Sequence, residues 1–129
     1  MLAVDTNVVI RYLVKDDDVQ SKRAREIVES GPVFIPATVV LECNWVLRSL
    51  YGFSHTEVMR ALRAFCGAQG ISVGDAAAVD LAFRLAELGL DFADALHLAQ
   101  AQSCEAFVTF DKRLAKRANG FDGVVVRLG

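Results

Sequence analysis

The sequence has only three cysteines, and no two of them have the CxxC spacing typical of metal-binding or redox motifs. Each of the three, Cys43, Cys66 and Cys104, lies in an apolar pattern of helical period. Cysteines in such a setting are commonly small core residues of proteins in a reducing compartment. We therefore expect them to fill space in a core.

A strong excess of one charge is also missing. The 14 Lys and Arg residues nearly balance the 16 Asp and Glu residues, which gives a net charge of -2 at pH 7. This balance argues against bulk electrostatic attraction to nucleic acid or to an anionic membrane surface. It leaves open a local basic patch on one part of the surface.

Long hydrophobic runs are absent as well. The longest nearly uncharged stretch, residues 31–47, is short for a membrane span and contains Pro32, Pro36, Glu42 and Asn44. The start of the sequence lacks a basic region followed by a long apolar core, so we expect no signal peptide. These features predict a cytoplasmic protein without a membrane segment.

What the sequence does contain is an alternation of short apolar runs and amphipathic segments. Its 129 residues, 53% of them hydrophobic, suit one domain over residues 1–129 with a substantial core. We expect strands over 2–4, 33–35, 71–73, 106–110 and 124–126, and helices over 8–15, 19–30, 38–51, 55–68, 76–88, 92–103 and 112–118. Capping residues indicate several helix starts, at Asp18, Ser54, Asp75 and Asp91. The alternation predicts an α/β fold with a short, mostly parallel sheet and helices on both faces.

Two of the expected strands end at an aspartate and lead into a helix. Asp5 follows residues 2–4, which we expect to be a buried strand, and Thr6 and Asn7 are residue types that cap helices. Asp111 follows residues 106–110 in the same way. In open α/β sheets ligands bind beyond the carboxyl ends of the strands, so the two acids would meet there if their strands are neighbours. A turn or cap role is the alternative for each acid.

Two further acids lie on the inward faces of expected helices. Glu42 has Val39 and Val46 three and four residues away, which places it on or beside an apolar stripe. Burying a carboxylate is costly unless it is paired, protonated or bound to metal, so a buried arginine partner is the alternative to a functional role. Asp94 has small and apolar neighbours, although an acid in a first turn also suits the helix dipole. We interpret the nearby Asp91 as a cap.

Four carboxylates gathered in one place would need protons or cations. Two like charges about 4 Å apart repel by roughly 4 kcal/mol at an effective dielectric of about 20. Oxygen ligands without a His or Cys set favour Mg²⁺ or Mn²⁺ over zinc. Such ions bind phosphates, activate water and stabilise a leaving oxyanion. The acids that would form this cluster, and so predict metal-dependent phosphodiester hydrolysis, are Asp5, Glu42, Asp94 and Asp111.

The order of these residues resembles the pattern of the PIN-domain family. The resemblance rests on Asp5-Thr6-Asn7, on Glu42 in an apolar helix, on Asp94-Ala95 in an alanine-rich helix and on Thr109-Phe110-Asp111 after a strand. The size and the order of elements are also similar over essentially the whole chain. Within the family, the sequence is most similar to the VapC-type toxin ribonucleases of toxin–antitoxin pairs.

This resemblance implies a PIN-like three-layer sandwich and a Mg²⁺- or Mn²⁺-dependent endoribonuclease. Asp5 and Asp94 would hold the main metal, and Glu42 and Asp111 would complete the site directly or through waters. Polar neighbours would orient ligands or water, and these are Thr6, Asn7 and Thr109. Members of the family commonly form homodimers and are held inactive by a small antitoxin whose tail covers the acidic site. His97 is not part of the pattern, and we interpret it as a core or rim histidine.

A basic segment directly follows Asp111. Its cationic residues are candidates for contacts with RNA phosphates, and they are Lys112, Arg113, Lys116 and Arg117. An ordinary solvated helix face explains the same residues equally well.

Two other functions would also place acids in such a fold. A phosphoacceptor receiver domain has acids at strand ends, but it needs paired acids after the first strand and a lysine at the end of a late one. A non-catalytic interaction module would use the acids to bind a basic peptide. A ribonuclease assay with and without a chelator separates these functions.

Overall fold

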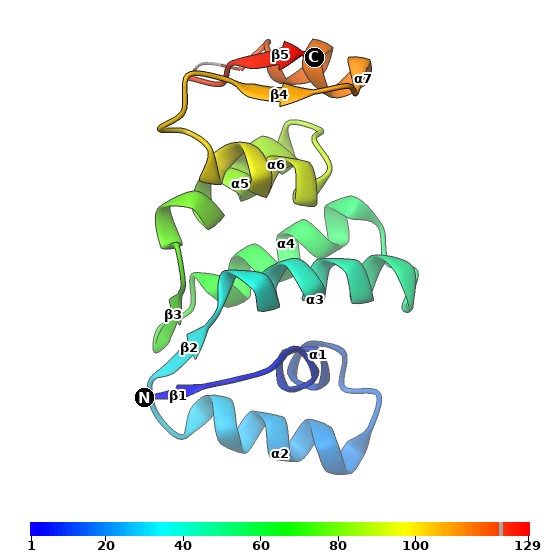
Figure 1. Cartoon of the computed structure of the whole chain (residues 1–129). Coiled ribbons are helices and arrows are strands. Elements are labelled where there is room, and N and C mark those ends of the chain that lie inside the picture. The colour runs from blue at the N-terminus through cyan, green and yellow to red at the C-terminus, as the bar shows by residue number, and fades with distance from the viewer. Residues whose placement is uncertain (122) are drawn as a thin grey trace. The chain divides into compact units, whose positions relative to one another are not determined.

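The structure is a computed structural model of the chain, and it describes residues 1–121 and 123–129 (Figure 1). The contacts between residues divide the chain into two compact units, Met1–Ala76 and Ala77–Gly129. Each unit has its own parallel sheet and its own helices. The single domain expected over residues 1–129 stays a prediction.

The first unit is built on a parallel sheet with the strand order β1-β2-β3. Its strands are β1 (Leu2–Ala3), β2 (Val33–Ile35) and β3 (Ile71–Val73). The helices that connect them are α1 (Thr6–Val14), α2 (Asp18–Glu29), α3 (Ala37–Ser49) and α4 (His55–Cys66). Helix α1 packs against both α2 and α3, and α3 packs against α4. The connections therefore place helices between consecutive parallel strands, as such strands require.

Buried aliphatic side chains form the core of this unit. Val33 and Ile35, at the two ends of the central strand β2, are 0% and 1% exposed. Val9 of α1, Val40 of α3 and Leu62 of α4 are each 1% exposed. Burying side chains of this size contributes about 1.5–3 kcal/mol each. The core thus fixes α1, which begins directly after Asp5, and α3, which carries Glu42.

The second unit contains a parallel pair of strands and three helices among its described residues. Its elements are α5 (Ala76–Glu87), α6 (Phe92–Gln100), β4 (Phe107–Thr109), α7 (Lys112–Ala118) and β5 (Val126–Leu128). The rings of Phe83 on α5 and Phe92 on α6 pack with their centroids 5.1 Å apart. The side chain of Asn119 accepts a hydrogen bond from the N–H of Val126 at 2.9 Å and donates to its carbonyl at 2.8 Å. This amide therefore joins the end of α7 to the start of β5.

The α/β class and the parallel pairing of the strands are confirmed. The expected strand over residues 33–35 coincides with β2, and the helix over residues 112–118 coincides with α7. The capping box at Ser54 and Glu57 is present, with both of its hydrogen bonds formed. Asp91 caps α6 by accepting a hydrogen bond from the N–H of Asp94.

Several local predictions are wrong. The first strand is not buried, since Leu2 is 54% exposed and only Val4, after the strand, is buried. The last strand is Val126–Leu128 instead of residues 124–126, because its pairing with β4 runs from Val126 opposite Phe107 to Leu128 opposite Thr109.

Two end-of-helix predictions are corrected as well. Asp17, not Asp18, caps α2, because Asp17 is extended and accepts from the N–H of Gln20 at 2.9 Å. Asp75 directly precedes α5 with φ at 52°, and its role as a cap stays a prediction. Helix α6 ends at Gln100, so Cys104 lies beyond it and is exposed instead of filling a core.

Candidate active site

Asp5 begins helix α1 and caps it. Its backbone is extended, with φ at -87° and ψ at 169°, and its Oδ1 accepts a hydrogen bond from the N–H of Thr6 at 2.7 Å. The side chain is exposed. Val4, immediately before it, is held to the sheet by a hydrogen bond from its N–H to the carbonyl of Phe34 at 3.2 Å. Asp5 is therefore a cap on a fixed backbone, and its second carboxylate oxygen is not used by the cap.

Glu42 lies on α3 and is exposed, so the prediction that it is buried beside an apolar stripe is wrong. The buried face of α3 is formed by Val40, Cys43 and Leu47, and Glu42 lies outside it. The residue is nevertheless fixed, because the hydroxyl of Thr6 donates a hydrogen bond to its Oε1. Thr6 itself is only 4% exposed. The first residue of α1 thus holds a carboxylate on α3.

Asp5 and Glu42 lie close to the same buried thiol. Cys43 donates a long hydrogen bond, 4.0 Å from sulfur to oxygen, to the carbonyl of Thr6. Burial, together with the nearby negative charges of Cys66, Glu42 and Asp5, raises the pKa of Cys43 to about 12. Both carboxylates also accept a hydrogen bond from Thr6, Asp5 from its N–H and Glu42 from its hydroxyl, so they lie at one end of the first unit.

Asp111 has the same relation to α7 that Asp5 has to α1. Its Oδ1 accepts a hydrogen bond from the N–H of Leu114 at 3.0 Å, which caps the helix. Its own N–H donates to the hydroxyl oxygen of Thr109 at 3.0 Å. Thr109, which we expected to orient ligands, therefore fixes the turn between β4 and Asp111.

Asp94 lies in the first turn of α6 and is partly buried. Burial raises the pKa of Asp94, and repulsion from Asp91 and Asp111 raises it further, while His97 acts in the opposite direction. Of these influences that of Asp111 is the smallest, so Asp111 exerts a weak repulsion on Asp94. Repulsion between carboxylates favours a proton or a cation near them.

The oxygen donors of these two acid pairs suit a divalent cation. The four residues offer carboxylate oxygens only, which is the ligand chemistry of Mg²⁺ and Mn²⁺. Each capping aspartate uses one oxygen in its cap and keeps a second for a ligand. Within the described part of either unit, three His, Cys, Asp or Glu side chains do not gather into one metal-binding group. Each unit thus supplies a pair of acids that fits part of a metal site.

The basic residues of α7 differ in their contacts with the rest of the protein. Lys112, Arg113 and Lys116 are exposed. The Nη1 of Arg117 donates a hydrogen bond to the carbonyl of Gly89 at 2.9 Å, which ties α7 to the loop before α6. His97 is exposed, and its ring stacks on Phe107 with the centroids 6.4 Å apart, so it is a rim histidine.

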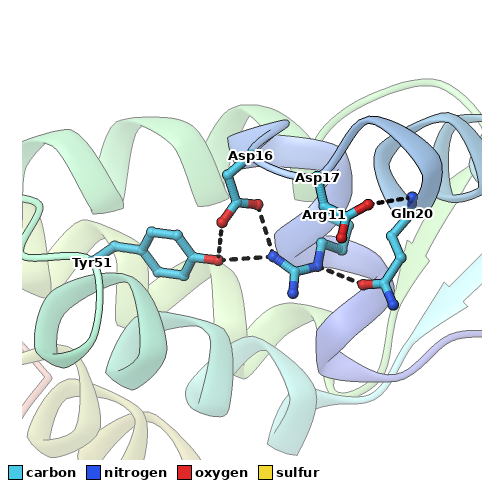
Figure 2. Close-up of polar contacts among 5 residues, drawn as sticks. All are labelled: Arg11, Asp16, Asp17, Gln20 and Tyr51. Carbon is cyan, nitrogen blue, oxygen red and sulfur yellow. Dashed lines mark hydrogen bonds and ion pairs between the residues drawn. The ribbon is translucent and has the colours of Figure 1, made fainter.

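A polar network on the first unit was not predicted from the sequence. Figure 2 shows Arg11 of α1 donating from Nε to Gln20 at 2.7 Å, and from Nη1 to Asp16 at 2.7 Å and to the hydroxyl of Tyr51 at 3.2 Å. Tyr51 in turn donates to Asp16 at 2.8 Å. The network joins α1 to Tyr51, two residues beyond the end of α3, so it supports the same helix pair that Thr6 and Glu42 bridge. Because the partners are up to 40 residues apart, no local pattern reveals it.

Asp5 and Asp111 each follow a parallel strand of an α/β chain, the position at which proteins of this class bind ligands. The particular family follows from comparison with known proteins. The family model of the PIN domain matches residues 2–120 of the sequence, and the chain therefore belongs to the PIN-domain family. PIN domains are usually nucleases and generally use divalent metal ions.

No curated protein matches the chain significantly. Among the described residues, none of the helices combines the length and the apolar character that crossing a membrane requires. Membership of the PIN-domain family does not favour the phosphoacceptor receiver considered as an alternative.

Proposed function

We propose that the chain is a Mg²⁺- or Mn²⁺-dependent endoribonuclease and the VapC-type toxin of a toxin–antitoxin pair. Asp5, Glu42, Asp94 and Asp111 are its metal-binding acids. Membership of the PIN-domain family supports a nuclease. The observation that carries the proposal is the presence of two carboxylate pairs, each with one member capping a helix that follows a strand.

The chain's own residues hold the acids ready for ligands. The caps at α1 and α7 fix Asp5 and Asp111 through one oxygen each. Thr6 fixes Glu42 through its hydroxyl. When bound, a divalent cation supplies an activated water and offsets the negative charge that develops on the phosphate. A general base from His or Lys is then not needed, which fits the placement of His97 against Phe107.

RNA phosphates are held by basic residues outside the acidic cluster. On α7 the exposed Lys112, Arg113 and Lys116 are suited to this role. Arg117 contributes less, because its guanidinium is engaged by the carbonyl of Gly89.

Asparagine substitutions test the metal-binding role without removing a helix cap. Asn caps helices about as well as Asp, so Asp5→Asn removes the charge and keeps the fold of α1. Cleavage of a labelled RNA in excess Mg²⁺ should fall by about 100-fold or more in Asp5→Asn and Asp94→Asn. Asp17→Asn, which alters the cap of α2, is the matched control and should cleave at the parent rate. Parent-like cleavage by Asp5→Asn would refute the mechanism.

Coupling between the two acid pairs tests whether one site uses both. Mn²⁺ affinity is measured by titration calorimetry for the parent, for Asp5→Asn, for Asp94→Asn and for the double variant. If the acids bind the same ion, the two losses are not additive and the double variant is little weaker than either single one. Additive losses would mean independent sites and would contradict the four-carboxylate proposal.

The toxin role and the assembly state have their own tests. Expression of the chain in a bacterial cytoplasm should arrest growth, and Asp5→Asn should relieve the arrest. If a small protein is encoded beside the chain, as expected of an antitoxin, its co-expression should also relieve the arrest. We expect a homodimer in light scattering. A chain that binds a basic peptide but cleaves no RNA with Mg²⁺ or Mn²⁺ would instead be a non-catalytic interaction module.

A further inference from the structure

A pocket of about 240 Å³ lies between α1 and α2, within the first unit. Its polar lining residues are Asn7 and Arg11 of α1 and Gln20 and Arg23 of α2, and its other lining residues are apolar. Among the described residues, no carboxylate lines it. Two guanidinium groups and two amides are the side chains that recognise phosphate oxygens in proteins. We propose that this pocket binds a backbone phosphate of the nucleic-acid strand.

Arg11 is already oriented for this role. Its guanidinium is held by Gln20 at Nε and by Asp16 and Tyr51 at Nη1, as Figure 2 shows. These hydrogen bonds use Nε and Nη1, and Nη2 carries no contact with the residues drawn. A guanidinium held by its neighbours loses less side-chain entropy when a ligand binds. Gln20 therefore both lines the pocket and fixes the cation beside it.

Arg23 supplies the adaptable second charge. Its ion pair with Glu26 is long, at 3.8 Å, and the two side chains are 72% and 54% exposed. An exposed pair of this kind contributes little to stability and is readily exchanged for another anion. Arg23 can therefore turn to a phosphate in the pocket at small cost to the fold.

The pocket is connected to the acidic site through α1. Asn7 and Arg11 are four residues apart, so they share one face of the helix. Asp5, at the start of the same helix, lies about 200° around the axis from Asn7, so a strand that reaches both crosses the beginning of α1. Along the helix, Asp5 and Arg11 are separated by roughly 9 Å at the usual rise per residue. A strand whose scissile phosphate lies at Asp5 could place a neighbouring phosphate in the pocket. The inference in this respect rests on the proposed nuclease function, and it assigns substrate binding to α1 and α2 in addition to α7.

The experiment compares two arginines of the same helix. Arg23→Gln removes a pocket residue, and Arg25→Gln removes an exposed arginine of α2 that does not line the pocket. Binding of a fluorescent single-stranded oligoribonucleotide is measured by anisotropy in EDTA, so that no cleavage occurs, between about 50 and about 200 mM salt. Loss of one phosphate contact should lower the slope of log affinity against log salt by about 0.7 for Arg23→Gln. Arg25→Gln should keep the parent slope.

A second measurement reports on the pocket directly. The Nε–H signal of Arg11 in a ¹⁵N NMR spectrum should shift when the oligoribonucleotide is added to the parent. Inorganic phosphate at the same phosphate concentration should shift it much less, since it lacks the contacts of a strand with the rest of the surface. Equal shifts would mean that the pocket takes free phosphate instead of nucleic acid, and would overturn the proposal.

The failure of this inference is distinct from failure of the proposed function. Equal salt slopes for Arg23→Gln and Arg25→Gln, an unmoved Arg11 signal, or no binding by the parent in EDTA would each overturn the phosphate pocket. If Arg23→Gln shows the expected smaller salt slope but the parent cleaves no RNA in Mg²⁺ or Mn²⁺, the phosphate pocket is supported and the proposed nuclease function is refuted.

Discussion

The hydroxyl of Thr6 donates a hydrogen bond to the carboxylate of Glu42, and this contact joins the first residue of α1 to the middle of α3. Thr6 is buried and Glu42 is exposed. Because Asp5 directly precedes Thr6, the same turn of chain presents one acid and positions another. The pair at this end of the first unit is therefore held by a backbone N–H and a hydroxyl, both of Thr6.

The substitution Thr6→Val tests this positioning role. Valine keeps the volume of threonine but cannot donate to Glu42, whose exposed carboxylate can turn to water instead. We expect the free energy of unfolding to fall by about 1 kcal/mol and Mn²⁺ affinity to fall by about 10-fold. Thr6→Ser keeps the hydroxyl and should restore the Mn²⁺ affinity. A Thr6→Val protein with parent Mn²⁺ affinity would show that the contact is only structural.

The sequence predicts the helix starts after Asp5 and Asp111 better than it predicts the surroundings of Glu42. Asp5 and Asp111 were recognised because an apolar run followed by an acid and a helix is a local pattern, and both indeed begin helices. Glu42 is predicted to face the core because of its helical spacing from apolar residues, but its side chain is exposed. Helical spacing identifies a residue near an apolar stripe, but which edge of the stripe is covered depends on the packing of α1 and α4 against α3.

The network around Asp16 should make stability depend on pH at the acid end. The hydroxyl of Tyr51 and the guanidinium of Arg11 lower the pKa of Asp16 below its ordinary value of 3.8, with the Tyr51 hydrogen bond the larger cause. A carboxyl whose pKa is lowered by folding stabilises the fold above its unfolded pKa and loses this contribution as pH falls through its folded pKa. Parent and Asp16→Asn should therefore differ in stability at neutral pH and converge below about pH 4.

Urea unfolding of both proteins over this pH range measures the effect. Tyr51→Phe is the matched background, because it removes the main cause of the lowered pKa and keeps the ring that stacks on Phe53. In that background, Asp16→Asn should change the pH dependence less than it does in the parent. If the difference in free energy of unfolding between the parent and Asp16→Asn stayed the same from pH 7 down to the lowest pH measured, Asp16 would not have a lowered pKa in the folded protein.

The cysteines should differ sharply in reactivity. Burial raises the pKa of Cys43 to about 12 and that of Cys66 to about 11, whereas Cys104 is exposed. At about pH 8 no more than roughly one in a thousand of the Cys43 and Cys66 thiols is a thiolate, so an alkylating agent should modify the exposed Cys104 first. Mass spectrometry of native protein should find one adduct, at Cys104, and three adducts after unfolding in urea. Rapid native labelling of Cys43 would contradict the burial of α3.

Features that depend on long-range contacts could not be predicted from local patterns in the sequence. Cys104 was expected in a core because its neighbours continue an apolar pattern, yet α6 ends at Gln100. The start of β5 at Val126 depends on its pairing with Phe107 and on the Asn119 side chain. By contrast, the capping box at Ser54 is a local hydrogen-bonded motif, and it was predicted correctly.

Asp111 combines a cap with a proposed ligand, and two substitutions separate these roles. Asp111→Asn keeps a side-chain acceptor for the N–H of Leu114, so the free energy of unfolding should change by only a few tenths of a kcal/mol. Asp111→Ala removes the acceptor and should cost about 1 kcal/mol. Both variants lose the carboxylate, and both should therefore lose Mn²⁺ affinity and RNA cleavage to a similar extent. Thermal unfolding and cleavage rates are measured on the same preparations. If cleavage followed stability, with Asp111→Asn as active as the parent and only Asp111→Ala impaired, Asp111 would be a cap alone and the metal would be held by the other acids.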